Sequence, residues 1–148
     1  MRFVRWWALI GSLCVAVGIF FFAGCMQNPY GEYSSGVLTE REYYLFSPSS
    51  QAAIQAEVEL CDYFSITGEK AVFVFETEEA ADRYAMKLLK TQGATVLFEE
   101  TVAGARCIYA QAKRMGAGVR IGGAYIHLHI VISGRRVQVG TPIVFGGY

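Results

Sequence analysis

Residues 77–93 read TEEAADRYAMKLLKTQG, and this stretch decides the fold. Thr77 is a suitable N-cap, Glu78 and Glu79 fall in the first turn, where the helix dipole favours acids, and Gly93 suits the position after the last turn. The apolar residues recur at helical spacing on one face: Ala81, Tyr84, Ala85, Leu88 and Leu89. The stretch therefore predicts an amphipathic helix over about 78–92 that covers an apolar surface.

The segments on both sides of this helix have the pattern of β-strands. Residues 54–61 alternate between apolar and polar, which favours a half-buried strand, although the composition of 48–60 also suits a helix. The other strand-like runs are 42–47, 71–76, 95–102, 105–113, 124–133 and 136–144. Together the runs predict an α+β fold with a single, mostly antiparallel sheet of six to seven strands and one covering helix.

The N-terminus has the pattern of an export signal. Arg2 and Arg5 precede an uncharged apolar run over 6–22, and Phe22-Ala23-Gly24-Cys25 follows. This segment resembles a bacterial lipoprotein precursor with its lipobox. The resemblance implies a signal peptide over 1–24, lipid attachment at Cys25, a lipidated tether over 25–39 and a domain over 40–148.

Two other interpretations of the same run remain open. About 20 apolar residues can span a bilayer, so the run could be an uncleaved transmembrane helix. It could also be an ordinary secretory peptide with an incidental cysteine. The lipoprotein interpretation and the helix interpretation both place the domain outside the cytoplasmic membrane and tethered to it.

Composition and charge exclude several classes of protein. The chain has 148 residues, 53% hydrophobic and 18% charged, with a formal net charge of zero. This composition excludes a disordered chain, and the absence of a basic excess argues against nucleic acid as a partner. No Gly-x-Ser-x-Gly motif is present, and the glycine-rich stretch 116–123 does not lead into a helix, so it reads as a connection between strands. We expect a non-catalytic protein without a cofactor.

Charge is divided unevenly along the chain. All 13 acidic residues lie between Glu32 and Glu100, whereas residues 104–148 carry six basic residues and no acid. Strands from the two halves could interleave in one sheet and neutralise each other. Alternatively, a basic patch could face lipid headgroups, a wall polymer or an acidic partner. The members we expect in such a patch are Arg120, Arg135 and Arg136.

The two histidines could hold a ligand. His127 and His129 alternate with apolar residues, so both are expected on the strand face opposite the apolar set, beside Tyr125. Two histidines at this spacing could bind a metal ion if Glu57, Glu59 or Cys61 on a neighbouring strand completed the site. The alternative is the solvated polar side of a sheet.

The domain has two cysteines apart from Cys14 and Cys25 of the export segment. Cys61 and Cys107 could form a disulfide outside the cytoplasm, or they could be buried free thiols.

The tail is similar to a known family over nine residues. Gly140-Thr141-Pro142-Ile143, with Tyr148 at the end, is similar to the close of YwmB-type secreted domains of spore-forming bacteria. No function or site follows from this similarity. We expect a membrane-anchored extracytoplasmic lipoprotein that binds an envelope protein or a cell-wall polymer. The alternative function is binding of a metal or small ligand through Tyr125, His127 and His129.

Overall fold

A computed structural model of the chain describes residues 14–15, 30, 35–59 and 61–145. The chain divides into two units, 1–32 and 33–148, and the fold below is that of the second. The lipobox with Cys25 lies outside the described residues. Among the residues described, no helix combines the length and the apolar character that crossing a bilayer requires.

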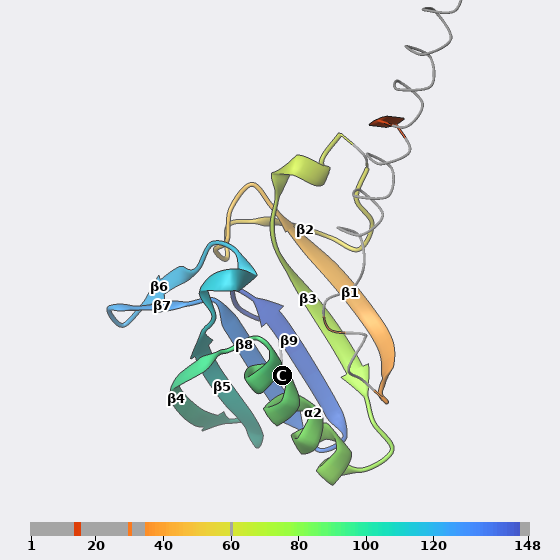
Figure 1. The fold of residues 1–148 in the computed structure, drawn as a ribbon, viewed down its shortest axis with the longest axis vertical. Coiled ribbons are helices and arrows are strands. Elements are labelled where there is room, and N and C mark those ends of the chain that lie inside the picture. Colours follow the sequence, from red (N-terminus) through yellow and green to blue (C-terminus); the bar gives the residue numbers. More distant parts are fainter. Residues whose placement is uncertain (1–13, 16–29, 31–34, 60, 146–148) are drawn as a thin grey trace, which may run out of the picture. The chain divides into compact units, whose positions relative to one another are not determined.

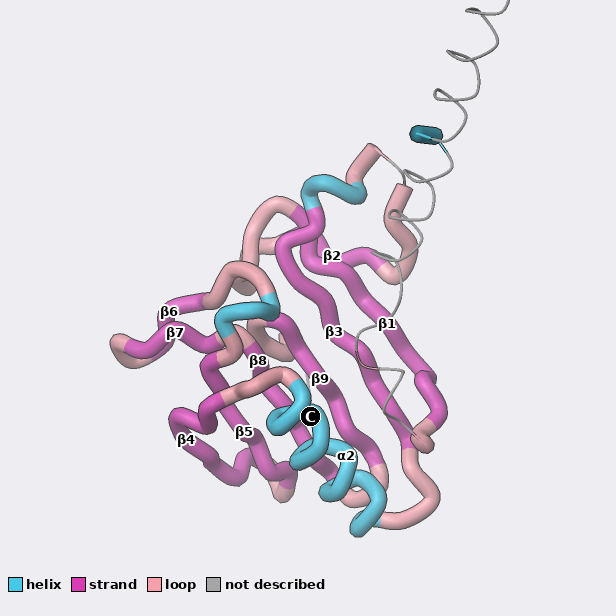
Figure 2. The backbone as a smooth tube through the Cα atoms, viewed as in Figure 1, coloured by secondary structure: helices cyan, strands magenta, loops and turns pink. Residues whose placement is uncertain are grey.

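The second unit is an α+β domain built on a seven-stranded antiparallel sheet (Figure 1). The strand order across the sheet is β2-β1-β3-β9-β8-β5-β4, and the backbone tube in Figure 2 follows the same order. Strands β6(Val119–Ile121) and β7(Ala124–Ile126) form a separate two-stranded sheet. The strands of the main sheet are β1(Val37–Leu45), β2(Ala53–Gln55), β3(Ile66–Val74), β4(Thr95–Val102), β5(Ala105–Gln111), β8(Leu128–Ser133) and β9(Arg136–Thr141).

Helix α2(Glu78–Thr91) covers one face of this sheet, which confirms the helix predicted from residues 77–93. The Thr77 hydroxyl accepts a hydrogen bond from the Ala80 backbone N–H at 3.2 Å, and Gly93 has the left-handed φ of 58°. The Tyr84 ring packs against Phe73 of β3 and against Phe75, which directly follows β3, with centroid distances of 5.2 and 5.0 Å. All five apolar residues predicted to face the core are buried.

The centre of the opposite face is buried as well. Tyr109 and Cys107 of β5 and Val131 of β8 form a cluster there with Val144. Val119 and Ile121 of the β6–β7 hairpin pack against this cluster, as does Ile143. The small second sheet and the segment after β9 therefore cover this face, although the alternating pattern predicted that it would be polar. As a result, β8 is shielded from solvent on both of its sides.

Several predicted strand boundaries are wrong. Strand β1 begins at Val37, so residues 37–39 belong to the sheet and not to a tether. The strand expected over 54–61 is limited to β2, and the described residues that follow it, 56–59 and 61, belong to no strand. The run 124–133 is divided at His127 into β7 and β8. The glycine-rich connection contains β6, which pairs with β7 and makes the single predicted sheet into two.

Two long connections leave the sheet at the same end. Leu45 pairs with Ile66, Lys70 pairs with Gly140, and Ala110 pairs with Leu128, so the register aligns the end of β1 with the end of β5. Residues 46–65, which include the 3-10 helix η2(Tyr63–Ser65), and residues 112–127, which include η3(Lys113–Met115), both start there. We call this end the loop end. The start of β1 and the β8–β9 turn lie at the opposite end (Figure 1), where Val37 pairs with Val74 and Val74 pairs with Arg136.

Candidate functional site

His129 is an internal support and is inaccessible to a ligand. Its side chain is 0% exposed, and its ring stacks on Tyr109 at 4.2 Å, while Tyr109 stacks on Phe98 at 4.3 Å. Its Nδ1 accepts a hydrogen bond from the Val144 backbone N–H at 3.2 Å. Burial lowers the pKa of His129 to about 4, so the ring is neutral at pH 7.

His127 lies between β7 and β8, which the alternating pattern predicted to be one continuous strand. Its backbone N–H donates to the Ala110 carbonyl at 3.0 Å, which brings β5 beside the β7–β8 break. The residue is 9% exposed, and its ring lies so close to Gly118 that a Cβ there would be 2.9 Å from Nε2. The Nδ1 atom has no hydrogen-bond partner among the described residues.

The predicted metal or ligand set is not assembled. Tyr125 is 54% exposed on the β6–β7 hairpin, away from the buried His129. Glu57 and Glu59 are exposed in the segment that follows β2, and β2 is four strands from β8, or about 19 Å at ordinary strand spacing. Within the described ranges, no three His, Cys, Asp or Glu side chains form a group that could hold a metal ion. The prediction failed because β2 is not a neighbour of β8 in the sheet and because His129 is buried.

The two domain cysteines are free thiols in the structure, which agrees with the free-thiol alternative and not with the disulfide, although only Cys107 is buried. Cys61 is exposed in the segment between β2 and η2, whereas Cys107 is 0% exposed in the interior of the sheet on β5. A disulfide requires Cα atoms within about 7 Å, and the sheet places β5 five strands from β2. Burial also raises the pKa of the Cys107 thiol.

The three arginines predicted to form a basic patch lie at two ends of the sheet. Arg120 is exposed on β6 at the loop end, whereas Arg135 and Arg136 lie at the far end of β8, a strand of six residues. Arg136 forms an ion pair with Glu40 at 3.4 Å. Arg106 likewise pairs with Glu99 at 2.9 Å. In these two pairs, a basic residue from the basic part of the sequence, 104–148, neutralises an acidic residue from the acidic part that precedes it. This agrees with the interpretation that strands from the two parts interleave in one sheet.

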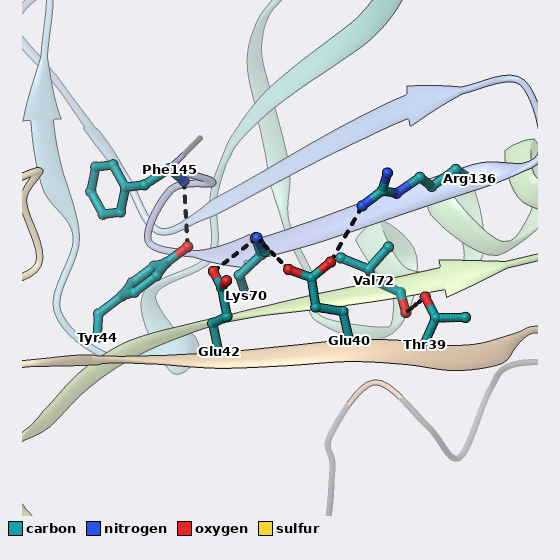
Figure 3. A network of polar contacts seen from close by, with 8 residues as sticks. All are labelled: Thr39, Glu40, Glu42, Tyr44, Lys70, Val72, Arg136 and Phe145. Carbon is teal, nitrogen blue, oxygen red and sulfur yellow. Dashed lines mark hydrogen bonds and ion pairs between the residues drawn. The ribbon is translucent and has the colours of Figure 1, made fainter. Parts of the chain in front are cut away.

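A charged network lies on β1 and β3 (Figure 3). The Lys70 ammonium group contacts Glu42 at 2.8 Å and Glu40 at 3.0 Å. Burial alone would lower the pKa of Lys70, but the hydrogen bonds to Glu42 and Glu40 outweigh it and raise that pKa. The hydrogen bond from Lys70 lowers the pKa of Glu40. Every charge in this network therefore faces an opposite one.

Large apolar side chains are exposed at the loop end. Phe46 is 69% exposed, Phe64 is 89% exposed, and Ile54 is 46% exposed. Their segments adjoin: the Phe46 backbone N–H donates to the Ser65 carbonyl at 2.8 Å, and Ile54 pairs with Tyr44. We call Phe46, Ile54 and Phe64 the apolar tip. The exposure of these residues was not predicted, although apolar residues within a stretch rich in Ser, Gln and Glu were a usable signal.

Phe46 has a backbone conformation that is rare for its residue type. Its φ is 66°, in the left-handed region that glycine adopts readily and that costs other residues about 1 kcal/mol or more. The side chain gains little burial in return, because it is 69% exposed. The strain therefore presents an aromatic ring to the surroundings, which is an arrangement typical of functional surfaces.

Comparison of the chain with protein families, with curated proteins and with solved structures gives no match.

Proposed function

We propose that the protein is a lipoprotein anchored at the extracytoplasmic face of the cell membrane. Its domain is a non-catalytic binding module that docks on another component of the cell envelope through the apolar tip. The observation that carries this proposal is the joint exposure of Phe46, Ile54 and Phe64 on segments held together by backbone hydrogen bonds.

The apolar tip has the composition of a protein interface, and in the isolated chain it is exposed because no partner covers it. Burying one such side chain against a partner contributes about 1.5–3 kcal/mol, so an exposed group of three is a substantial source of binding free energy. The exposed Glu57 and Glu59 flank the tip in sequence. An apolar centre with a polar rim is the usual anatomy of a protein–protein interface. A protein partner therefore fits better than an anionic wall polymer, which these acids would repel.

The anchor is tested by lipid labelling. Cells that express the wild-type chain or Cys25→Ala are grown with a palmitate analogue, and labelled protein is detected after denaturing electrophoresis. We expect label on the wild type only, together with a heavier unprocessed band for Cys25→Ala. Equal labelling of both chains would contradict lipid attachment at Cys25.

Docking is tested by photocrosslinking in the intact envelope. A benzoylphenylalanine residue replaces Phe64 of the apolar tip or, as a matched control, Met86, which is an exposed apolar residue on α2 with 42% exposure. We expect a discrete crosslinked product from position 64 and none from position 86. Mass spectrometry of the product identifies the partner. The absence of a product specific to position 64 would overturn the docking proposal.

A further inference from the structure

The loop end carries two charged connections of opposite sign. Residues 46–65 contain Glu57, Glu59 and Asp62 and no basic residue, whereas residues 112–127 contain Lys113, Arg114 and Arg120 and no acid. Five of these six side chains are exposed, and Asp62 is partly exposed. We call the first set the acidic pole and the second set the basic pole.

The poles differ from the charges on the body of the sheet. Glu40, Lys70 and Arg136 are engaged in ion pairs within the domain, and so are Arg41 with Glu69 and Arg106 with Glu99. Within the part of the chain that the structure describes, none of the six pole residues forms an ion pair. Their charges are therefore available to a partner.

The spacing of the poles suits a symmetric contact. The connection that contains the acidic pole joins β1 to β3, and the connection that contains the basic pole joins β5 to β8. In the sheet, β9 lies between β3 and β8. From β3 to β5 is three strand spacings, or about 14 Å. A two-fold axis that passes between the poles, perpendicular both to the strands and to the line that joins the poles, places the acidic pole of one copy over the basic pole of the other. The same operation forms the contact twice, as an isologous interface requires.

We propose that two copies of this chain pair through their loop ends about such an axis, with each acidic pole against the partner's basic pole. The inference rests on the proposed function, because it names a second copy as the envelope protein that covers the apolar tip. In the pair, the tip faces the surface around the exposed Tyr125, which pairs with Arg120 in the β6–β7 hairpin. Charge complementarity favours a second copy over an anionic membrane, since the acidic pole would be repelled by anionic lipid.

The position of the domain's N-terminal strand is compatible with this pairing. Val37, where β1 begins, lies at the opposite end of a nine-residue strand, about 27–31 Å from the loop end. The pairing surface is therefore separate from the point at which the chain enters the sheet. Two anchored copies would lie end to end.

The test measures the mass of the full-length processed protein in detergent by analytical ultracentrifugation. We expect a dimer whose dissociation constant rises about tenfold or more between 50 and 500 mM salt, because exposed charges are screened. Glu57→Lys/Glu59→Lys reverses two of the three charges of the acidic pole, and Arg114→Glu/Arg120→Glu reverses two of the three charges of the basic pole. Each variant alone should be monomeric at concentrations at which the wild type is dimeric, because like charges then meet at both contacts.

Mixing the two variants separates loss of pairing from loss of folding. In a mixed pair, the introduced lysines face the introduced glutamates at one contact, and the unchanged acidic and basic poles face each other at the other. The mixture should therefore form a heterodimer with an affinity close to that of the wild type. The matched control is Glu76→Lys/Arg135→Glu, which changes exposed charges at the opposite end and should leave the dimer unchanged.

Three results would overturn the inference: a monomeric wild type at low salt, no recovery on mixing, or an equal loss of dimer in the control. A monomeric wild type whose position 64 still crosslinks to a different envelope protein would reject the self-pairing and leave the proposed function standing. Loss of every crosslink from position 64 would reject the docking proposal itself.

Discussion

His129 and Val144 join the sheet to the segment that follows its last strand: the Val144 backbone N–H donates to the His129 Nδ1 atom at 3.2 Å. An Nδ1 that accepts a hydrogen bond carries no proton, so this contact requires the neutral imidazole. Val144 in turn belongs to the apolar cluster on the face opposite α2. Protonation of the buried His129 ring would therefore break the hydrogen bond that holds Val144 in the cluster covering this face.

We predict that the stability of the domain falls as the pH drops from 6.5 to 4.5. Burial lowers the folded-state pKa of His129 to about 4, against an ordinary value of 6.5. A lowered histidine pKa means that the unfolded chain binds the proton more tightly, so stability is complete above pH 6.5 and is lost toward the folded pKa. The total loss should be about 3 kcal/mol, measured as the free energy of unfolding in urea at a series of pH values.

The control for this prediction is His129→Leu. The variant should be less stable than the wild type at pH 7.5, and its free energy of unfolding should change much less between pH 6.5 and 4.5. The carboxylate of Glu40, whose pKa is lowered by Lys70, loses its contribution only below its ordinary value of 4.5, which is outside this window. An unchanged pH slope in the variant would show that another group is responsible.

Lys70→Met should destabilise the domain by about 2 kcal/mol. The substitution leaves Glu40 and Glu42 beside each other without the ammonium group that bridges them at 3.0 and 2.8 Å. Adding Glu40→Gln and Glu42→Gln removes the repulsion, so the triple variant should recover most of the loss. Urea unfolding of the single, double and triple variants gives the coupling free energy. Additive effects would contradict a shared network.

Gly68→Ala should destabilise the domain by about 3 kcal/mol. A Cβ on Gly68 would overlap the Thr141 carbonyl oxygen and lie 2.9 Å from the Pro142 Cδ atom, so β3 and the end of β9 must separate. The matched control is Gly93→Ala, where the added Cβ meets nothing within 4 Å and only the φ of 58° is strained. That variant should lose about 1 kcal/mol in thermal or urea unfolding. Equal losses would show that the contact relaxes without cost.

Leu88→Ala should lower the free energy of unfolding by about 2–5 kcal/mol, because Leu88 is 0% exposed between α2 and the sheet. Met86→Ala on the same helix serves as the control, since Met86 is 42% exposed and its truncation should cost less than about 1 kcal/mol. Similar melting temperatures for the two variants would mean that α2 does not pack through the face described here.

The sequence predicted the elements whose local signals agree with their tertiary environment. Helix α2 has a cap, a dipole-compatible first turn and an apolar stripe, and β4 was predicted with the bounds that the structure shows. Strands β8 and β9 lie within the predicted runs 124–133 and 136–144, and they pair with each other. In these segments, local propensity and long-range packing favour the same conformation.

The candidate site could not be predicted because its features depend on long-range pairing. The alternation at His127 and His129 suggested a polar strand face, but β6, β7 and the segment after β9 cover that face. The length of β2 depends on which residues of β1 are available for pairing. The residues after Gln55 carry no information about that pairing. Likewise, only the strand order places residues 46–65 and 112–127 at one end of the sheet.

The thiols of Cys61 and Cys107 should react at very different rates in the folded protein. Cys61 is exposed, whereas Cys107 is 0% exposed and burial raises its pKa, so little reactive thiolate forms there. Iodoacetamide should therefore modify Cys61 first and Cys107 only after unfolding in urea, as followed by intact mass. Cys61→Ser should abolish the fast modification and leave the slow one unchanged. Because both cysteines are free, unfolding without any reductant should be enough to expose the second thiol. A chain that takes up iodoacetamide at neither position until a reductant is added would instead show that the two cysteines are bonded.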